Sequence, residues 1–315
     1  MSERYKQVGV DIEAGNAFVD RLKEKAPAIG GFGGMFKVPT EYEKPILVSG
    51  ADGVGTKINM CRVFNQWDTI GIDLVAMCAN DVITSGAKPL YFLDYISTGK
   101  ISPIIDQIME GVLKGCWKAG IELIGGETAE HSRVAPPPSS QDDIDLAGFC
   151  TGIVEEHDVI DGSIIKQGDA IIGIQSSGIH SNGYTLINDM LWRHQLSYRD
   201  TPELIEPTRI YVPTIQRLLD EIPVLGMAHI TGGGLKENLS RCLPEGLTPY
   251  IDWTSWPMPP IFNKIRTAGA VQDVDMRKIF NMGIGYCIVV PPEVVDDAMI
   301  LIDYPCQVIG HVCTT

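Results

Sequence analysis

Residues 49–57 read SGADGVGTK and follow a short apolar run. Two of the glycines have the spacing of a P-loop, in which Gly-Lys-Ser/Thr must follow after four residues. Here Thr56 precedes Lys57, so this order is inverted, and Asp52 stands where a P-loop leaves bare backbone N–H groups for phosphate. The stretch therefore predicts a glycine turn that presents a carboxylate and a lysine. Such a turn differs from a P-loop.

The composition is that of a soluble globular protein with room for two domains. The chain has 315 residues, of which 44% are hydrophobic and 21% are charged. Its 40 acidic and 25 basic residues give a formal net charge of −15, which argues against nucleic acid or an anionic membrane as the main partner. An anionic small substrate is not excluded. The N-terminus shows no signal peptide, and no apolar run approaches the ~18 residues of a membrane span.

Eight cysteines are scattered along the chain, and no two of them form a C-x-x-C pair. Most lie in apolar runs, which favours reduced thiols packed as small hydrophobic groups over a zinc site or a disulfide framework. The six histidines show no H-x-x-x-H spacing either. These patterns predict a reducing compartment, the cytoplasm.

Hydrophobic periodicity and turn residues divide the first half into alternating helices and strands. Asp11 is a suitable N-cap for the first helix, and the glycines at 30–34 predict a flexible hinge or lid. Residues 135–143 (APPPSSQDD) are the most loop-like segment. The predicted helices are 11–25, 68–87 and 102–119, and the predicted strands are 45–50 (short and buried), 89–97, 121–127 and 144–154.

The pattern restarts after Glu155, which predicts two α/β domains, of α+β character, over residues 1–155 and 156–315. Strands are predicted at 169–177, 226–230, 284–290 and 306–312, and helices from about Tyr184, from about Pro207, from Leu235, and at 259–268, 273–279 and 293–302.

Three carboxylates recur beside small residues, at strand ends or on a buried helix: Asp52, Asp81 and Glu127. Asp73 lies eight residues before Asp81 and so on the same side of the helix. Carboxylates in apolar surroundings are costly unless they are paired or hold a cation, and Mg²⁺ takes carboxylates together with phosphate oxygens. The three sites together favour a metal–phosphate site over the alternative that each carboxylate caps a turn or a helix.

Two histidines lie where predicted strands of the second half end at glycine turns. His180 occurs in SSGIHSNGY and His229 in AHITGGG. Such positions often bind ligands in α/β folds, although a hydrogen-bonded structural role is an equal alternative. Backbone N–H groups of 176–178 and 232–234 could bind phosphate at the helices that follow.

These motifs together resemble a known family, the aminoimidazole ribonucleotide synthetases or phosphoribosylformylglycinamidine cyclo-ligases of purine biosynthesis. The resemblance runs in order from about Tyr5 to Val312. It is carried by the segments YKQVGVDIEAGN, GGFGG, VSGADGVGTK, DTIGIDLVAMCANDV, GGETAE, AGFCTGIVEEHDVIDG, SSGIHSNGY, PTRIYV and HITGGGLKENLSRCLP.

The resemblance implies an N-terminal α/β domain whose sheet pairs with that of a second copy in a homodimer, ATP bound near that interface, and a second α/β domain that completes the cleft. It also implies the conversion of ATP and formylglycinamidine ribonucleotide to aminoimidazole ribonucleotide, ADP and phosphate. The apolar strands 89–97 and 147–154 independently favour an obligate dimer, because they are too apolar for an open sheet face.

On this resemblance, roles are expected for the following residues. His180, His229 and Asp81 serve proton transfer or the substrate phosphate; Lys23, Gly53, Gly55, Thr56, Lys57, Asp73, Asp94, Gly125 and Gly126 bind ATP and its phosphates; Ser176, Ser177, Asn182, Thr231, Gly232 and Gly233 bind substrate; and Asp52, Asp81 and Glu127 bind Mg²⁺, with K⁺ as a further candidate cofactor.

The sequence departs from the family at one loop. The family usually continues GGETAE with Met-Pro-Gly-x-Tyr, whereas this chain reads HSRVAPPPSSQDDID. Two other functions therefore stay open. One is a related ATP-dependent phosphotransferase that acts on another small molecule, and the other is a nucleotide-binding relative without catalysis. The intact Asp52, Asp81, Glu127, His180 and His229 argue against the second.

Overall fold

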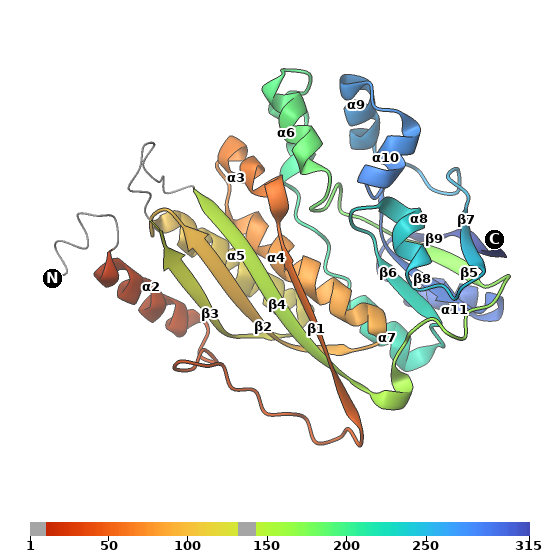
Figure 1. Ribbon diagram of the computed structural model, residues 1–315, viewed down its shortest axis with the longest axis horizontal. Coiled ribbons are helices and arrows are strands. Elements are labelled where there is room, and N and C mark those ends of the chain that lie inside the picture. The colour runs from red at the N-terminus through yellow and green to blue at the C-terminus, as the bar shows by residue number, and fades with distance from the viewer. Residues whose placement is uncertain (1–10, 132–142) are drawn as a thin grey trace.

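The computed structural model describes residues 11–131 and 143–315, and it contains two sheets that are covered by helices (Figure 1). The α/β fold predicted from the sequence is confirmed, with sheets that are mostly antiparallel. The first half contains α2 (Ile12–Lys25), β1 (Pro45–Gly53), α3 (Ile58–Phe64), α4 (Asp68–Val82), β2 (Lys88–Thr98), α5 (Pro103–Ala119), β3 (Glu122–Glu130) and β4 (Ile144–Glu155).

The first sheet has the strand order β1-β4-β2-β3. Its β1–β4 and β2–β4 pairs are antiparallel, and its β2–β3 pair is parallel. Helices α4 and α5 cover one face, and α2 lies beyond the β3 edge (Figure 1). On that covered face Phe92 and Ile96 are fully buried. Side chains on the opposite face remain open, and Leu47, Tyr95 and Phe149 are 59%, 41% and 44% exposed.

Glycines let α4 and α5 approach each other closely. A Cβ atom at Gly71 would collide with the backbone of α5, and one at Gly111 would collide with the carbonyl oxygen of Asp68. At Gly115 a Cβ would come within 2.8 Å of the Val75 side chain. Helix α4 is therefore enclosed between α5 and the sheet, and almost all of its residues are buried.

The second half contains β5 to β9 and six helices among the described residues. Its sheet is entirely antiparallel, with the strand order β6-β8-β5-β9-β7. No described helix is both long and apolar enough to span a membrane. The elements are β5 (Ala170–Gln175), α6 (Tyr184–Trp192), α7 (Val212–Glu221), β6 (Gly226–His229), α8 (Gly234–Ser240), β7 (Leu247–Ile251), α9 (Pro260–Gly269), α10 (Asp273–Ile279), β8 (Ile284–Val290), α11 (Val295–Leu301) and β9 (Cys306–Thr314).

Local signals located several elements well. Asp11 caps α2, where its carboxylate accepts a hydrogen bond from the N–H of Ala14, and Ser102 caps α5 in the same way through Ile104. In the lid predicted at 30–34, only Gly34 is shown to lie against β3, where its Cβ would be 2.8 Å from the carbonyl oxygen of Ile124, and Gly31, Phe32 and Gly33 are exposed. The loop predicted at 135–143 lies outside the described residues except for Asp143.

Three expectations about elements were wrong. Strand β1 is largely exposed and not buried, since it is an edge strand of a sheet with one open face. Helix α7 begins at Val212 and not near Pro207, because residues 207–211 are not helical, and Thr208 and Tyr211 donate their N–H groups to Asp73 and Asn80 of α4. Strand β7 was missed. It contains Pro249, which is tolerated because β7 is an edge strand.

The close crossing of α4 and α5 predicts a large effect from a single methyl group. Gly111→Ala should lower the free energy of unfolding by roughly 1–3 kcal/mol, because the helices must move apart to admit the Cβ. The matched control is Gly15→Ala, another helical glycine, whose Cβ would only touch Ile101 at 3.6 Å. It should be neutral or stabilising by up to about 1 kcal/mol. Urea unfolding of both variants measures the difference, and equal stabilities would contradict the packing described.

Candidate functional site

The C-terminal end of α4 meets the second half of the chain at a carboxylate–imidazole contact. Asp81 on the last turn of α4 accepts a hydrogen bond from Nδ1 of His229 at 2.7 Å, and His229 is the last residue of β6. The histidine side chain is 1% exposed and the aspartate side chain is 48% exposed. The Nε2 atom of His229 is buried without a hydrogen-bond partner among the described residues. The contact therefore fixes the ring through one nitrogen and leaves the other for a ligand.

Asp52 lies beside this pair, at the end of β1. Burial raises the pKa of Asp52, and the negative charge of Asp81 raises it further, while His229 lowers it. The Asp52 carboxylate accepts one hydrogen bond, from the N–H of Gly53 at 2.7 Å. Because the charge of Asp81 disfavours that of Asp52, a cation bound beside them would be favourable.

A cavity of about 380 Å³ opens next to the Asp81–His229 contact. Its walls come from α4, from β6 and the turn after it, and from α8. The lining residues that can bind a ligand through polar groups are Asp81, Thr84, Ser85, Asp161, His229, Thr231, Asn238 and Arg241.

The glycine turn at 231–234 lies at the edge of this cavity and is held internally. Asn238 donates to the carbonyl oxygens of Gly232 and Gly234 at 3.1 and 2.8 Å. The N–H of Gly233 donates to Lys278 and that of Gly234 to Thr231. Because these two N–H groups already donate to backbone carbonyl oxygens, they are not available to bind phosphate as predicted. Thr231 lines the cavity, and Asn182 lies close to Gly232.

Lys57 is placed differently from its expected phosphate contact. Its ammonium forms an ion pair with Asp73 at 2.8 Å and donates to the carbonyl oxygen of Glu206 at 2.6 Å. Both charged side chains have no exposed surface. The geometry argues against the ATP contacts predicted for Lys57 and Asp73 and assigns them to the junction between the two halves.

His180 is also not positioned as predicted. It is 1% exposed and adopts a left-handed backbone conformation with φ of 67°. Its Nε2 accepts a hydrogen bond from the N–H of Ser177 at 3.2 Å, and its Nδ1 has no partner among the described residues. Burial lowers the pKa of His180 well below its usual range, so the ring is neutral. Its ring lies near Tyr211 and away from the cavity, which favours the structural alternative.

The two serines predicted to bind substrate do not join the Asp81–His229 site. The N–H of Ser176 donates to Gly283 and the N–H of Ser177 to His180, so neither is free for phosphate. Ser177 instead lines two other cavities, of about 390 and 300 Å³, together with Arg209. The predicted substrate-binding set is thereby divided between different surfaces.

Glu127 does not gather with Asp52 and Asp81. It pairs in register with Tyr95, on the open face of the first sheet, whereas Asp52 lies at the β1 edge beside α4. No group of three or more His, Cys, Asp or Glu side chains among residues 11–131 and 143–315 is arranged to hold a metal ion. The predicted three-carboxylate site is therefore not assembled within the described part of one chain.

Asp94 is enclosed by glycines in the middle of the first sheet. It lies in register between Gly148 and Gly126, and a Cβ at Gly126 would overlap the Asp94 carboxylate. Burial raises the pKa of Asp94 to about 7, and the charge of Glu127 contributes. Glycine at 126 is thus the residue that leaves room for a buried carboxyl group.

The remaining predicted ATP-binding residues fall in three regions. Gly53, Gly55 and Thr56 form the turn after β1, which docks on α6 through Thr56, whose hydroxyl lies 3.0 Å from that of Thr185. Gly55 has φ of 50° and open space around it. Lys23 is exposed on α2, which Figure 1 places at the end of the first sheet remote from the second half. Gly125, on β3, faces the segment that contains Gly34.

Sequence reasoning missed Arg241 and Asn238. Both are on or directly after α8, the helix that follows the glycine turn, and both line the cavity. The signal that could have found them is the segment KENLSRC, because polar residues one and two turns into a helix after a glycine turn face the same ligand space.

Comparisons with known proteins show which family the chain matches. Residues 36–154 match the family described as AIR synthase related protein, N-terminal domain, and residues 166–315 match the C-terminal domain of the same description. A phosphoribosylformylglycinamidine cyclo-ligase from Synechococcus sp. (strain CC9902) is 47% identical, over 99% of this chain and 96% of its own length. One from Thermosynechococcus vestitus is 46% identical, over 92% and 90%.

Solved structures share the fold at lower identity. Escherichia coli HypE, a hydrogenase maturation protein, superposes with a TM-score of 0.70 at 17% identity, over 94% of this chain and 91% of its own. A HypE structure in complex with ATP gives 0.67 at 17% identity, over 94% and 87%. Thiamine-monophosphate kinase from Stenotrophomonas maltophilia K279a gives 0.68 at 18% identity, over 95% and 94%.

The raised pKa of Asp94 predicts a pH-dependent stability. The unfolded chain releases this proton near 3.8 and the folded chain near 7, so the contribution is fully present below pH 3.8 and is lost as the pH rises to about 7. Asp94→Asn removes the charge and should make the protein more stable than wild type at pH 8, by roughly 1.4 kcal/mol per unit of pKa difference at most.

Urea unfolding at pH 5 and pH 8, without divalent ions, measures this effect. Asp106→Asn, which makes the same change in an exposed surface pair with Arg21, is the control and should keep the wild-type profile. A wild-type pH profile for Asp94→Asn would show that the Asp94 carboxyl ionises as in the unfolded chain.

Proposed function

We propose that this chain, which belongs to the AIR synthase related family and within it groups with phosphoribosylformylglycinamidine cyclo-ligases, closes the imidazole ring of 5-aminoimidazole ribonucleotide in purine biosynthesis. It is an enzyme that converts formylglycinamidine ribonucleotide and ATP to aminoimidazole ribonucleotide, ADP and phosphate. The observation that carries the assignment of the site is the Asp81–His229 contact beside Asp52, at a cavity of about 380 Å³.

The chemistry requires that the formyl oxygen leave. Transfer of the γ-phosphoryl group to this oxygen releases ADP and turns the oxygen into part of a phosphate. The amidine nitrogen then attacks the formyl carbon, the ring closes, and phosphate departs with the oxygen while the nitrogen gives up a proton. Such a reaction is catalysed chiefly by positioning and by neutralising charge on the phosphoryl group.

Asp52 and Asp81 are the residues that would hold Mg²⁺. They fit the ion because they are close enough for the charge of Asp81 to raise the pKa of Asp52, and neither is neutralised by a lysine or arginine among the described residues. Bound there, Mg²⁺ neutralises charge on the phosphates of ATP. Glu127 is a ligand only if it is supplied by a second copy. The structure offers no support for K⁺.

His229 is the residue that would accept the proton released at ring closure. Asp81 holds its Nδ1–H, so its Nε2 carries the free lone pair, and this atom has no partner among the described residues. Thr231 lines the same cavity, Asn182 lies close to Gly232, and these residues would orient the substrate. His180, which is buried and neutral, supports the loop at Ser177 and takes no part in proton transfer.

ATP as the co-substrate is supported by the fold. A HypE structure with the same architecture is described as a complex with ATP. Gly53, Gly55 and Thr56, with Asp94 and Gly126 further along the sheet, remain the candidate nucleotide contacts of this chain. The eight cysteines are free thiols, which fits a reducing compartment such as the cytoplasm.

A homodimer completes the proposal. The open face of the first sheet carries Leu47, Tyr95 and Phe149, which are 59%, 41% and 44% exposed. A contiguous apolar sheet face of this kind is costly in water, and pairing it with the same face of a second copy would bury it.

The proposed function predicts a defined loss in two variants. Asp81→Asn and His229→Gln should each lower turnover by about 10²–10⁴-fold, because the first removes a metal ligand and the anchor of the imidazole and the second removes the base. A coupled ADP-release assay, with and without formylglycinamidine ribonucleotide, measures this. Asp106→Asn, an exposed carboxylate on α5, should change turnover less than about twofold. ADP release that does not depend on the ribonucleotide would refute the proposed substrate.

The dimer is tested separately. Phe149→Glu places a charge on the open sheet face and should shift the protein to a monomer in sedimentation at low micromolar concentration. Trp117→Glu, on the other side of the molecule, is the control: it is 80% exposed on α5 and should leave the association state unchanged. A wild-type protein that sediments as a monomer at every concentration would refute the dimer.

A further inference from the structure

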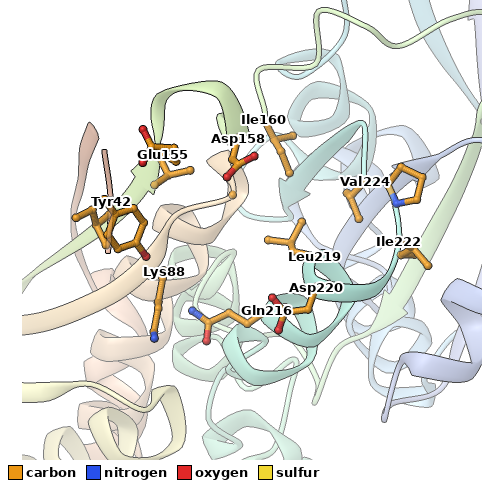
Figure 2. Close-up of a pocket in the computed structure, with 14 residues that line it drawn as sticks. Tyr42, Lys88, Glu155, Asp158, Ile160, Gln216, Leu219, Asp220, Ile222 and Val224 are labelled. Atoms are coloured by element: carbon orange, nitrogen blue, oxygen red, sulfur yellow. The ribbon is translucent and has the colours of Figure 1, made fainter. Parts of the chain in front are cut away.

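A second cavity, of about 500 Å³, lies between the two halves of the chain, and Ile160 is the one lining residue that it shares with the cavity at the Asp81–His229 contact (Figure 2). Tyr42 and Lys88 line it from the first half, Asp158 and Ile160 from the segment that joins the halves, and the helix α7 from the second half. Its size is that of a small-molecule site, and junctions between domains are common places for such sites. Nothing in the proposed reaction uses it.

The charged groups around this cavity are of both signs, and two of them have no ion-pair partner among the described residues. The Lys88 ammonium and the Asp220 carboxylate form no ion pair with any described residue. Asp158 lies 3.6 Å from the exposed ring of His157 and keeps 66% of its side chain exposed. In Figure 2, Asp158 extends toward the cavity from above, while Lys88 and Asp220 lie along its lower side with Gln216 between them.

Two other polar groups set the chemistry of the walls. The Glu155 carboxylate is already committed, since it accepts hydrogen bonds from the N–H groups of Glu43 and Lys44, both at 2.7 Å. Burial raises the pKa of Tyr42, and the charges of Glu41, Glu155 and Asp158 raise it further, so the Tyr42 hydroxyl stays protonated and can donate. The free charges are thus one cation, Lys88, and two anions, Asp158 and Asp220.

The remaining wall is apolar. Leu219 and Ile222 on and after α7, with Ile160 and Val224, supply aliphatic surface, and Leu219 points into the cavity in Figure 2. A ligand that matches all of these walls has one anionic group for Lys88, two cationic groups for the two aspartates, and a methylene chain for the apolar surface. Its net charge is +1, opposite in sign to the walls, where Lys88 supplies one positive charge and Glu155, Asp158 and Asp220 supply three negative ones.

We propose that this cavity between the two halves is a binding site for a basic α-amino acid, of which L-arginine is the probe. The α-carboxylate is held by Lys88 and the Tyr42 hydroxyl, and the ammonium and guanidinium groups are held by Asp158 and Asp220. The aliphatic chain packs on Leu219 and Ile160. Because the walls belong to both halves, the ligand joins them and stabilises their present arrangement.

Titration calorimetry on the full chain tests this with three probes. L-Arginine should bind at least about tenfold more tightly than agmatine, which lacks the carboxylate, and than L-citrulline, which lacks the side-chain charge, since a hydrogen bond to a charged group contributes roughly 1.5–3 kcal/mol. Lys88→Met should make arginine and agmatine bind alike. Asp158→Asn and Asp220→Asn should each weaken arginine binding by about tenfold or more.

Asp296→Asn, an exposed carboxylate on α11, is the control and should bind arginine as wild type does. Lys88, Asp158 and Asp220 are all exposed, and thermal melting of each variant without ligand verifies that the fold is kept. The proposal is overturned if arginine binds no better than agmatine and citrulline, or if no binding is seen at millimolar concentration. It is also overturned if the Lys88 and Asp220 variants bind all three probes as wild type does.

Discussion

The buried ion pair between Lys57 and Asp73 holds the two halves of this protein together at one carboxylate oxygen. Oδ1 of Asp73 accepts from the Lys57 ammonium, from the hydroxyl of Ser181, and from both the N–H and the hydroxyl of Thr208. Two fully buried charges are costly unless every partner is in place, and removing one partner of such a pair typically costs ~3–5 kcal/mol. The glycine turn after β1, the helix α4 and two loops of the second half are therefore fixed relative to one another. The sequence did not indicate this role. A lysine beside glycines resembles a phosphate-binding turn when the ion-pair partner of the lysine is unknown.

Helix α4 connects the Lys57–Asp73 ion pair to the Asp81–His229 site. Asn80 on α4 donates to the carbonyl oxygen of Arg209 and accepts from the N–H of Tyr211, at 2.8 and 2.9 Å. Asp81 then meets His229. Asp73 and Asp81 are eight residues apart, which is about 12 Å along a helix. Helix α4 therefore carries the buried carboxylate of the ion pair and, about 12 Å further on, the carboxylate of the candidate site. The glycines at the α4–α5 crossing serve this arrangement, since they allow α4 to be held on all sides.

Sequence reasoning succeeded where the cause of a structure is local. The cap at Asp11 and the strands β5, β6, β8 and β9 of the second sheet follow from neighbouring residues and from hydrophobic patterning. It failed where contacts with residues distant in the sequence determine the local structure. The start of α7 is delayed because residues 207–211 bind α4, and His180 is buried against Tyr211 instead of facing a ligand. At the site, the importance of Asp52, Asp81 and His229 could be inferred one residue at a time. Their contact could not, because residues 81 and 229 are far apart in the chain and no short-range pattern joins them.

The segment between the two halves gives the two cavities a common wall. Ile160 lines both of them, Asp158 lines the cavity near Lys88, and Asp161 lines the one near His229. A ligand bound between Asp158 and α7 would therefore contact the same joining segment that borders the Asp81–His229 site. If the affinity for one ligand changes when the other is bound, the change must be equal in both directions, because coupling between two binding equilibria is reciprocal. The α4 side of the site is held by the buried hydrogen bonds of Asp73 and Asn80, whereas the joining segment supplies the wall that the two cavities share.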